Sequence, residues 1–249
     1  MNPLLRPLPL VLALQAAIAG PAFAAGFTVT TGSTVNSGQS LTGAGVVQQG
    51  GTLSTSGSTV AVSVGSGAST LTNAGTIQQT GSGRTIDANS GTPVLTISNQ
   101  KGALIDAAGA VAIRLNRAAG QYLIDNQGSI TQSGVSVNGE RAIQAAADYS
   151  GTGNQIINGA ADNRDALISS NGNDAIRLGS NFTLTNYGRI VSTGTVNTSC
   201  PDYLTCTNDY SAADGVAIEN GRGNVAILNH GSIEGPRHAI DGGDPLAAD

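Results

Sequence analysis

Two short hydrophobic phrases alternate along most of this chain, and polar or small residues separate them. In the first phrase, an aliphatic run is followed by Asn, any residue and Gly, and an Ile comes two positions after the Gly, as in "LTNYGRI" at Leu184. The second places Ile after a small or polar residue, as in "VAIRL" at Val111 and "DAIRL" at Asp174. The asparagines of the first phrase lie at Asn73, Asn99, Asn126, Asn158, Asn186 and Asn229. Their spacings of 26, 27, 32, 28 and 43 residues are typical of a repeat protein.

Each repeat contains apolar runs of three to five residues bounded by Gly, Asn, Asp and Ser, which predict strands and turns. One unit cannot bury its own apolar face, so it must stack on its neighbours. The sequence therefore predicts an all-β fold, a right-handed single-stranded parallel β-helix (solenoid) of irregular coils of about 26–32 residues. The segment "ERAIQAAADY" at Glu140 has helical spacing, but its alignment with the other Ala-Ile phrases favours a strand.

The repeated asparagines predict a ladder along the axis of the β-helix. At a bend between strands, each amide can bond the backbone or the equivalent Asn one coil away. The Gly two residues later is expected to supply a positive φ, and the following Ile is expected to point inward. Register follows from these repeats, because a slip of one residue would turn every inward Ile outward.

The residue after each Ala-Ile or Thr-Ile pair is expected to point outward and to form a charged row. Neighbouring coils lie about 4.8 Å apart, so residues of opposite charge in this row should meet. We expect the pairs Asp87–Arg114 and Arg177–Glu219, each contributing at most about 1 kcal/mol at an exposed site. The row comprises Asp87, Arg114, Gln144, Arg177, Glu219 and Asp241. We interpret it as a solvated face and not as a catalytic strip.

Three regions are expected along the chain. Residues 1–24 predict a secretory signal peptide, with a short apolar run and a small-x-small site for cleavage between Ala24 and Ala25. Residues 25–70 lack the full phrases and predict irregular N-terminal coils, or a cap over the first strand edge. The repeat β-helix is expected over 71–249, with a last coil that is incomplete.

Composition narrows the possible functions. Only 11% of residues are charged and 3% are aromatic, and small or β-branched residues suit strands stacked around a narrow interior. Beyond the predicted signal peptide, ten basic residues oppose sixteen acidic ones, a net charge of −6. The sequence has no basic run or basic patch interleaved with aromatics, so nucleic acid is not an expected partner. No cofactor is expected.

The longest insertion, at about 195–213, carries the two cysteines of the chain. In an exported protein, Cys200 and Cys206 are expected to form a disulfide that closes a small surface loop. Tyr203 and Tyr210 are the aromatic residues of this loop, which makes it a candidate recognition loop. A metal site is not expected, because the only histidines, His230 and His238, are distant from the cysteines in sequence.

No catalytic residues are expected. His230 occupies the variable position between Asn and Gly, where other repeats have Ala74, Gln127 and Tyr187, so we interpret it as an exposed turn residue. The chain has no G-x-S-x-G elbow, and its aspartates are scattered among the repeats. The segment "NGNDAIRLG" at Asn171 faintly matches a calcium-binding nonapeptide, but a turn is the better interpretation of one imperfect copy.

A signal peptide followed by N-x-G-x-I and A-I phrases resembles the pertactin-like β-helix passenger of a Gram-negative autotransporter. The resemblance covers residues 71–240 well and 27–70 vaguely. It implies a non-enzymatic protein that is exported through the inner membrane to the cell surface or secreted, acting as an adhesin or interaction scaffold. The implied partners are a host or bacterial surface protein or glycan, and an outer-membrane β-barrel translocator that this chain does not contain. A secreted polysaccharide-acting enzyme and a structural stalk remain as alternatives.

Overall fold

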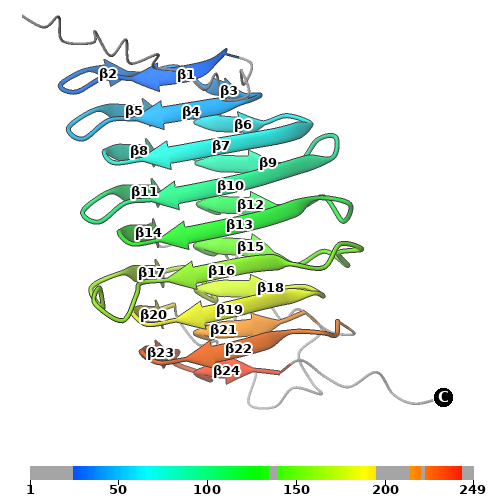
Figure 1. Ribbon diagram of the computed structural model, residues 1–249. Helices are drawn as coiled ribbons and strands as arrows, with labels where there is room; N and C mark the ends of the chain where they lie inside the picture. The colour runs from blue at the N-terminus through cyan, green and yellow to red at the C-terminus, as the bar shows by residue number, and fades with distance from the viewer. Residues whose placement is uncertain (1–24, 135–139, 195–212, 220–221, 243–249) are drawn as a thin grey trace, which may run out of the picture.

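The computed structural model describes residues 25–134, 140–194, 213–219 and 222–242, and every regular element in these ranges is a strand. The strands form three parallel sheets of eight strands each (Figure 1). No helix within the described ranges is long and apolar enough to cross a membrane. The predicted all-β parallel β-helix is therefore confirmed.

The strands are assigned to sheets A, B and C. Sheet A contains β1 (Ala25–Val29), β4 (Ala44–Val47), β7 (Gly67–Asn73), β10 (Pro93–Asn99), β13 (Gln121–Asn126), β16 (Asn154–Asn158), β19 (Phe182–Asn186) and β22 (Ala226–Asn229). Sheet B contains β2 (Thr34–Val35), β5 (Thr52–Thr55), β8 (Thr76–Gln79), β11 (Leu104–Ala107), β14 (Ser129–Gln132), β17 (Leu167–Ser170), β20 (Arg189–Ser192) and β23 (Ser232–Glu234). Sheet C contains β3 (Gln39–Leu41), β6 (Val62–Val64), β9 (Ile86–Ala88), β12 (Ile113–Leu115), β15 (Ile143–Ala145), β18 (Ile176–Leu178), β21 (Val216–Ile218) and β24 (Ile240–Asp241).

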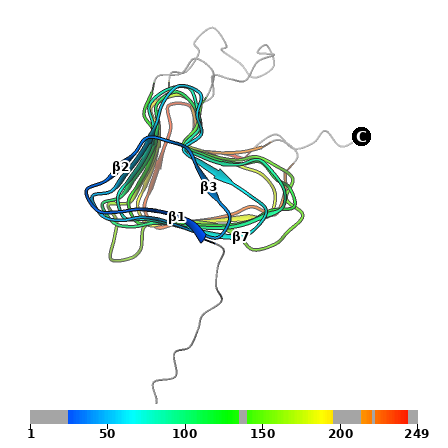
Figure 2. The ribbon, with the colours of Figure 1, turned by 90° about the horizontal axis from the view of Figure 1, so that it is seen from above.

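One strand from each sheet makes one coil, so β1–β3 form coil 1 and β22–β24 form coil 8. Each strand from β1 to β21 pairs with the strand three places later in the sequence, because the chain returns to the same sheet after one turn. Seen along the stack, the coils superimpose on a three-sided outline (Figure 2). The segment at Glu140, which has helical spacing, contains the strand β15 as predicted.

The core is a set of columns in which each coil contributes the same kind of side chain. In sheet B, the Ile that follows the Asn phrase points inward as predicted; it is fully buried from Ile77 to Ile190, and Ile233 in the last coil is partly buried. This column runs through Leu53, Ile77, Ile105, Ile130, Ile168 and Ile190, each paired in register with the next. Burial of one such side chain contributes about 1.5–3 kcal/mol. The stack therefore depends on contacts between coils, and a single coil has no core of its own.

The first two coils are more regular than the sequence predicts. Strands β1–β6 join the same three sheets as the later coils, with one register shift between Ala25 and Phe27. The corner that later coils fill with Asn is filled here by Val29 and Val47, and Val47 pairs with Asn73. Alternation of small and β-branched residues therefore sets the register of these coils without the full phrase.

Candidate functional site

The asparagines at the end of sheet A form a continuous ladder of side-chain hydrogen bonds. The Nδ2 of each Asn donates to the Oδ1 of the Asn in the next coil, at 2.7–2.8 Å, from Asn73 to Asn229. The same Nδ2 atoms also donate to backbone carbonyls, for example from Asn158 to Arg189 at 3.1 Å. Asn73 through Asn186 are fully buried, so the amides are occupied by one another and are not available to a ligand.

In most copies of the Asn phrase the glycine has a different role from the one predicted, whereas Gly102, three residues after Asn99, has the predicted positive φ, 80°. Gly75 and Gly188 are not among the glycines with positive φ, so backbone freedom is not the reason for them. A Cβ at Gly75 would lie 2.3 Å from the carbonyl oxygen of Gly51, and one at Gly188 would lie 2.2 Å from that of Ala166. Glycine is required here because the backbone of the preceding coil passes too close for a side chain.

A second polar corner lies at the end of sheet B, and the sequence analysis missed it. It places Thr55, Gln79, Gln132, Ser170 and Ser192 in equivalent buried positions. Ser170 Oγ donates to the Glu140 carbonyl at 3.0 Å, and Ser192 Oγ donates to the Asn173 carbonyl at 2.6 Å. The signal was present in the sequence, since each of these residues follows the inward aliphatic residue of sheet B by two positions.

Many of the chain's charged residues lie next to this corner, along the N-terminal ends of the sheet C strands. We call this group the charged strip. Backbone register stacks Arg84, Val111, Arg141, Asp174, Asp214 and His238 in one column, two positions before the first inward residue of sheet C. The charged strip comprises Arg84, Asp87, Arg114, Glu140, Arg141, Asp174, Arg177, Asp214, Glu219, Arg237, His238 and Asp241. The sequence predicted only its outward row.

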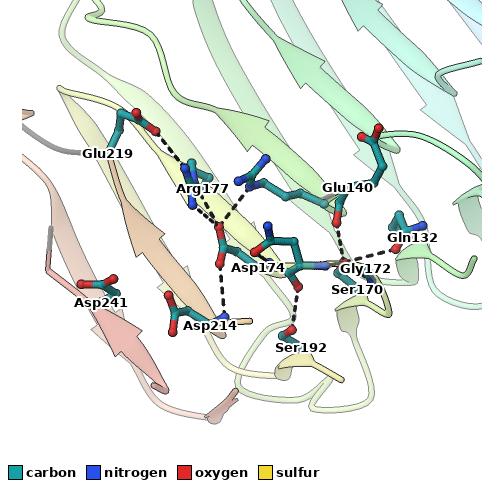
Figure 3. Close-up of polar contacts among 12 residues, drawn as sticks. Gln132, Glu140, Ser170, Gly172, Asp174, Arg177, Ser192, Asp214, Glu219 and Asp241 are labelled. Atoms are coloured by element: carbon teal, nitrogen blue, oxygen red, sulfur yellow. Dashed lines mark hydrogen bonds and ion pairs between the residues drawn. The ribbon is translucent and has the colours of Figure 1, made fainter. Parts of the chain in front are cut away.

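Asp174 lies at the centre of the charged strip and is fully buried (Figure 3). Its Oδ2 accepts from Arg141 Nε at 3.0 Å and from Arg177 Nε at 2.9 Å. Its Oδ1 accepts from the backbone N–H of Asp214 at 3.2 Å. Burial lowers the pKa of Arg141, and the positive charge of Arg177 adds to this, while Asp174 acts in the opposite direction. Two guanidinium groups therefore neutralise this buried carboxylate.

Asp214 is the second fully buried carboxylate, one coil further along the stack. Arg237 donates to both of its oxygens, from Nε at 3.1 Å and from Nη2 at 2.7 Å. Arg237 Nη2 also contacts the carboxylate of Asp241. His238 Nδ1 lies 3.3 Å from Asp214 Oδ1.

Asp214, His238 and Asp241 are close enough to bind a metal ion together, since one ligand atom from each lies within 4.8 Å of the others. The guanidinium of Arg237 already bridges the two carboxylates. A cation would therefore have to displace Arg237, so these residues fit an ion-pair cluster better than a metal centre.

The outward row differs from the prediction in two ways: the Arg114 and Asp87 side chains are only 16% and 13% exposed and so are not on a solvated face, and one residue of the row is out of register. Asp87 and Arg114 pair as expected, through two hydrogen bonds of 2.8 Å. Glu219, however, does not stand in register with Arg177, because Ala217 occupies that position. Val216, and not Ile218, pairs with Ile176 at the inward position, so the phrase "VAIEN" is shifted by two residues relative to "DAIRL". Glu219 still reaches Arg177, at 3.4 Å.

Glu140 is the carboxyl group of the charged strip with the most distinctive environment. Burial raises its pKa, and the positive charges of Arg84, Arg141 and Arg114 counteract part of that rise. Among the described residues, Arg84 makes no ion pair within 4 Å, and its buried Nε has no hydrogen-bond partner. A half-buried acid beside this guanidinium is, within the described ranges, the arrangement closest to an acid–base site.

Two aromatic clusters were also missed by the sequence analysis. Tyr122, Tyr149 and Phe182 stack edge to face in the interior, with ring centroids 5.6 and 5.1 Å apart. Burial raises the pKa of Tyr122 to about 12. On the surface, Tyr187 and His230 stack with centroids 4.8 Å apart and an interplanar angle of 19°. His230 is exposed and lies in a bend, in agreement with its prediction as a turn residue, but its ring stacks on that of Tyr187.

No protein-family model, curated protein or solved structure matches this chain. The predicted signal peptide, the disulfide Cys200–Cys206 and the recognition loop with Tyr203 and Tyr210 lie outside the described residues. Ala25, predicted to follow the cleavage site, is the first residue of β1. We therefore infer the function from the chain's own geometry.

Proposed function

We propose that this chain is a non-enzymatic, exported β-helix scaffold that acts at the cell surface or after secretion as an adhesin. The observation that carries this proposal is the state of the two carboxylates that the fold brings together. Asp174 and Asp214 are fully buried, and arginines bind both of them. A glycoside-cleaving site needs carboxyl groups that reach a substrate, and these two are enclosed.

The remaining architecture supports the same proposal. The Asn ladder from Asn73 to Asn229, the second polar corner and the aliphatic columns inside hold the coils in register, which makes an elongated body with three long faces (Figure 1). Stacked solenoids of this kind present extended surfaces for binding. The pertactin-like autotransporter passenger remains the family that we propose, on the basis of the repeated phrases.

The test compares adhesion of the intact chain with that of a variant in which a Gly-Ser linker of equal length replaces residues 195–213. Each protein is immobilised on beads, and binding to bacterial and epithelial cells is counted. We expect the intact chain to retain cells above the level of bare beads. Loss of binding in the variant would assign the contact to that loop, whereas retained binding would place it elsewhere. No binding by the intact chain would contradict an adhesin and leave the structural stalk.

A polysaccharide-acting enzyme is the second candidate, because Glu140 is a half-buried acid with a raised pKa beside Arg84. Its test is incubation with acidic and neutral polysaccharides, followed by measurement of reducing ends. Turnover that disappears in Glu140→Gln, but not in Asp165→Asn on an exposed loop, would support the enzyme. Absence of turnover by the wild-type chain would count against it.

A further inference from the structure

A surface cluster outside the charged strip carries an inference that deepens the proposed function and rests on it. Tyr187 and His230 occupy the variable position of the Asn phrase in coils 7 and 8. Their rings stack, with centroids 4.8 Å apart. Tyr187 is partly exposed and His230 is exposed. The four preceding coils have Ala74, Gln100, Gln127 and Gly159 at this position, so the ring pair is local to this end of the corner.

Arg164 joins the ring pair from the connection between β16 and β17. Its Nη1 donates to the backbone carbonyl of His230 at 2.8 Å. Since β16 and β17 belong to coil 6 and His230 to coil 8, the side chain must cross coil 7 where Tyr187 lies. The structure therefore places a guanidinium group against the backbone of His230, at the same corner as the two stacked rings.

The backbone that presents Arg164 is held in place by its neighbour. Asn163 is largely buried, and its Nδ2 donates to the carbonyl of Gln127 at 2.8 Å and to its side-chain oxygen at 3.0 Å. Ala160 and Asn163 also form a backbone bridge. Such anchoring reduces the conformational entropy that Arg164 would lose on binding a ligand.

Arg164 forms no ion pair within the part of the chain that the structure describes, although two exposed acids flank it in the sequence. Neither Asp162 nor Asp165 pairs with it, and the Asp165 carboxylate lies 3.9 Å from Lys101 Nζ. The remaining N–H groups of Arg164 can therefore donate to an external carboxylate, which a guanidinium can bind through two parallel hydrogen bonds.

We propose that Arg164, Tyr187 and His230 form a binding site for an acidic saccharide, with the carboxylate of the sugar on Arg164 and an apolar face of its ring against the aromatic pair. The aromatic rings supply flat apolar area, and the guanidinium supplies charge recognition. A uronic acid and a sialic acid share this chemistry. The site contains none of the residues of the predicted Cys200–Cys206 loop, and so gives the proposed adhesin a second, glycan-binding contact.

The test measures binding of trigalacturonic acid, 3′-sialyllactose and neutral lactose to the wild-type chain by isothermal titration calorimetry. We expect at least one acidic sugar to bind, lactose to bind at least about tenfold more weakly, and affinity to fall as salt is raised. The two acidic probes distinguish a uronate from a sialate ligand. Equal binding of lactose, or no binding of either acidic sugar, would overturn the site.

Variants separate the site from non-specific attraction. Arg164→Gln and Tyr187→Ala are each expected to weaken the acidic sugar about tenfold. Arg117→Gln is the matched control, because Arg117 is also exposed and also donates to a single carbonyl, that of Gly91 at 3.0 Å. Gln100→Ala is the control for Tyr187→Ala, because Gln100 occupies the same variable position in coil 4. Thermal unfolding of each variant establishes that it is folded, and an equal loss in Arg117→Gln would overturn the proposal.

The cell-binding assay keeps this inference distinct from the proposed function. Cells that bind wild type and Arg164→Gln equally, in the absence of sugar binding, would leave the adhesin standing and remove the saccharide site. Sugar binding that depends on Arg164, without any binding to cells, would keep the site and contradict the adhesin.

Discussion

Asn126 and Asn186 occupy the same buried corner two coils apart, and Asn158 between them hydrogen-bonds to both at 2.8 Å. The Asn158 amide donates through Nδ2 to Asn186 in the next coil, and its Oδ1 accepts from Asn126 in the preceding coil. Because each amide depends on the next, a change at one position leaves unsatisfied groups in two coils.

Asn158→Ala is therefore expected to reduce the free energy of unfolding by about 2–4 kcal/mol, since it strands a buried donor on Asn126 and a buried acceptor on Asn186. Urea titration followed by circular dichroism measures the change. Gln155→Ala, at an exposed position on the same strand, is the control and should change stability by less than about 0.5 kcal/mol. Similar losses in the two variants would contradict a ladder that stabilises the fold.

Gly188→Ala tests the close approach of neighbouring coils. The added Cβ would lie 2.2 Å from the Ala166 carbonyl oxygen, so the coils must separate locally. We expect destabilisation of about 1–3 kcal/mol or more, as for overpacking of a core. In Gly223→Ala the new Cβ has nothing within 4 Å, and the melting temperature should hardly change. A Gly188→Ala protein as stable as Gly223→Ala would show that the coils are not packed as described.

Asp174→Asn tests the charged strip. The change leaves Arg141 without its carboxylate inside the protein, so we expect a loss of about 3–5 kcal/mol. Asp165→Asn removes a pair whose side chains are 90% and 68% exposed, and is expected to cost about 0.5 kcal/mol or less. Denaturant titration of both variants compares the two losses. Equal effects would mean that Asp174 is solvated in solution.

The raised pKa of Glu140 predicts that the stability of the protein depends on pH. Its pKa in the folded protein is raised above the ordinary 4.5 by burial, so between these two values the folded state binds more protons than the unfolded state. Its contribution to stability is therefore fully present below pH 4.5 and is lost as pH rises through the folded value. Glu140→Gln should be more stable than wild type above this window, and the difference should shrink on acidification. A difference that grows on acidification would show that the pKa is lowered.

The repeated residues explain how much of this structure could be predicted. Asn at one corner and Ile two positions beyond the Gly recur in most coils, so their ladder and their inward direction could be predicted from the spacing. The column that holds Arg84, Arg141, Asp174 and Asp214 has no single repeated residue type, since Arg, Val, Asp and His all occur in it. Only the pairing between coils brings these side chains together, and the two-residue shift at Val216 is not visible in the phrase "VAIEN". The contact between Tyr187 and His230 does not follow from either turn residue alone. It follows from the Asn register, which places the two rings in neighbouring coils.

The stacking of coils is tested most directly by electron–electron distances between spin labels on the outer face of sheet A, with Cys200 and Cys206 replaced by Ser. Thr72 and Thr185 lie in one outward row, four coils apart, and Leu228 follows in the next coil. At about 4.8 Å per coil, the backbones at Thr72 and Thr185 should be roughly 19 Å apart, and those at Thr72 and Leu228 roughly 24 Å. Although Thr185 and Leu228 are far apart in the sequence, the second distance should exceed the first by only one coil spacing. Distances that instead scatter widely, or that place Leu228 far from this line, would contradict a stack along one axis.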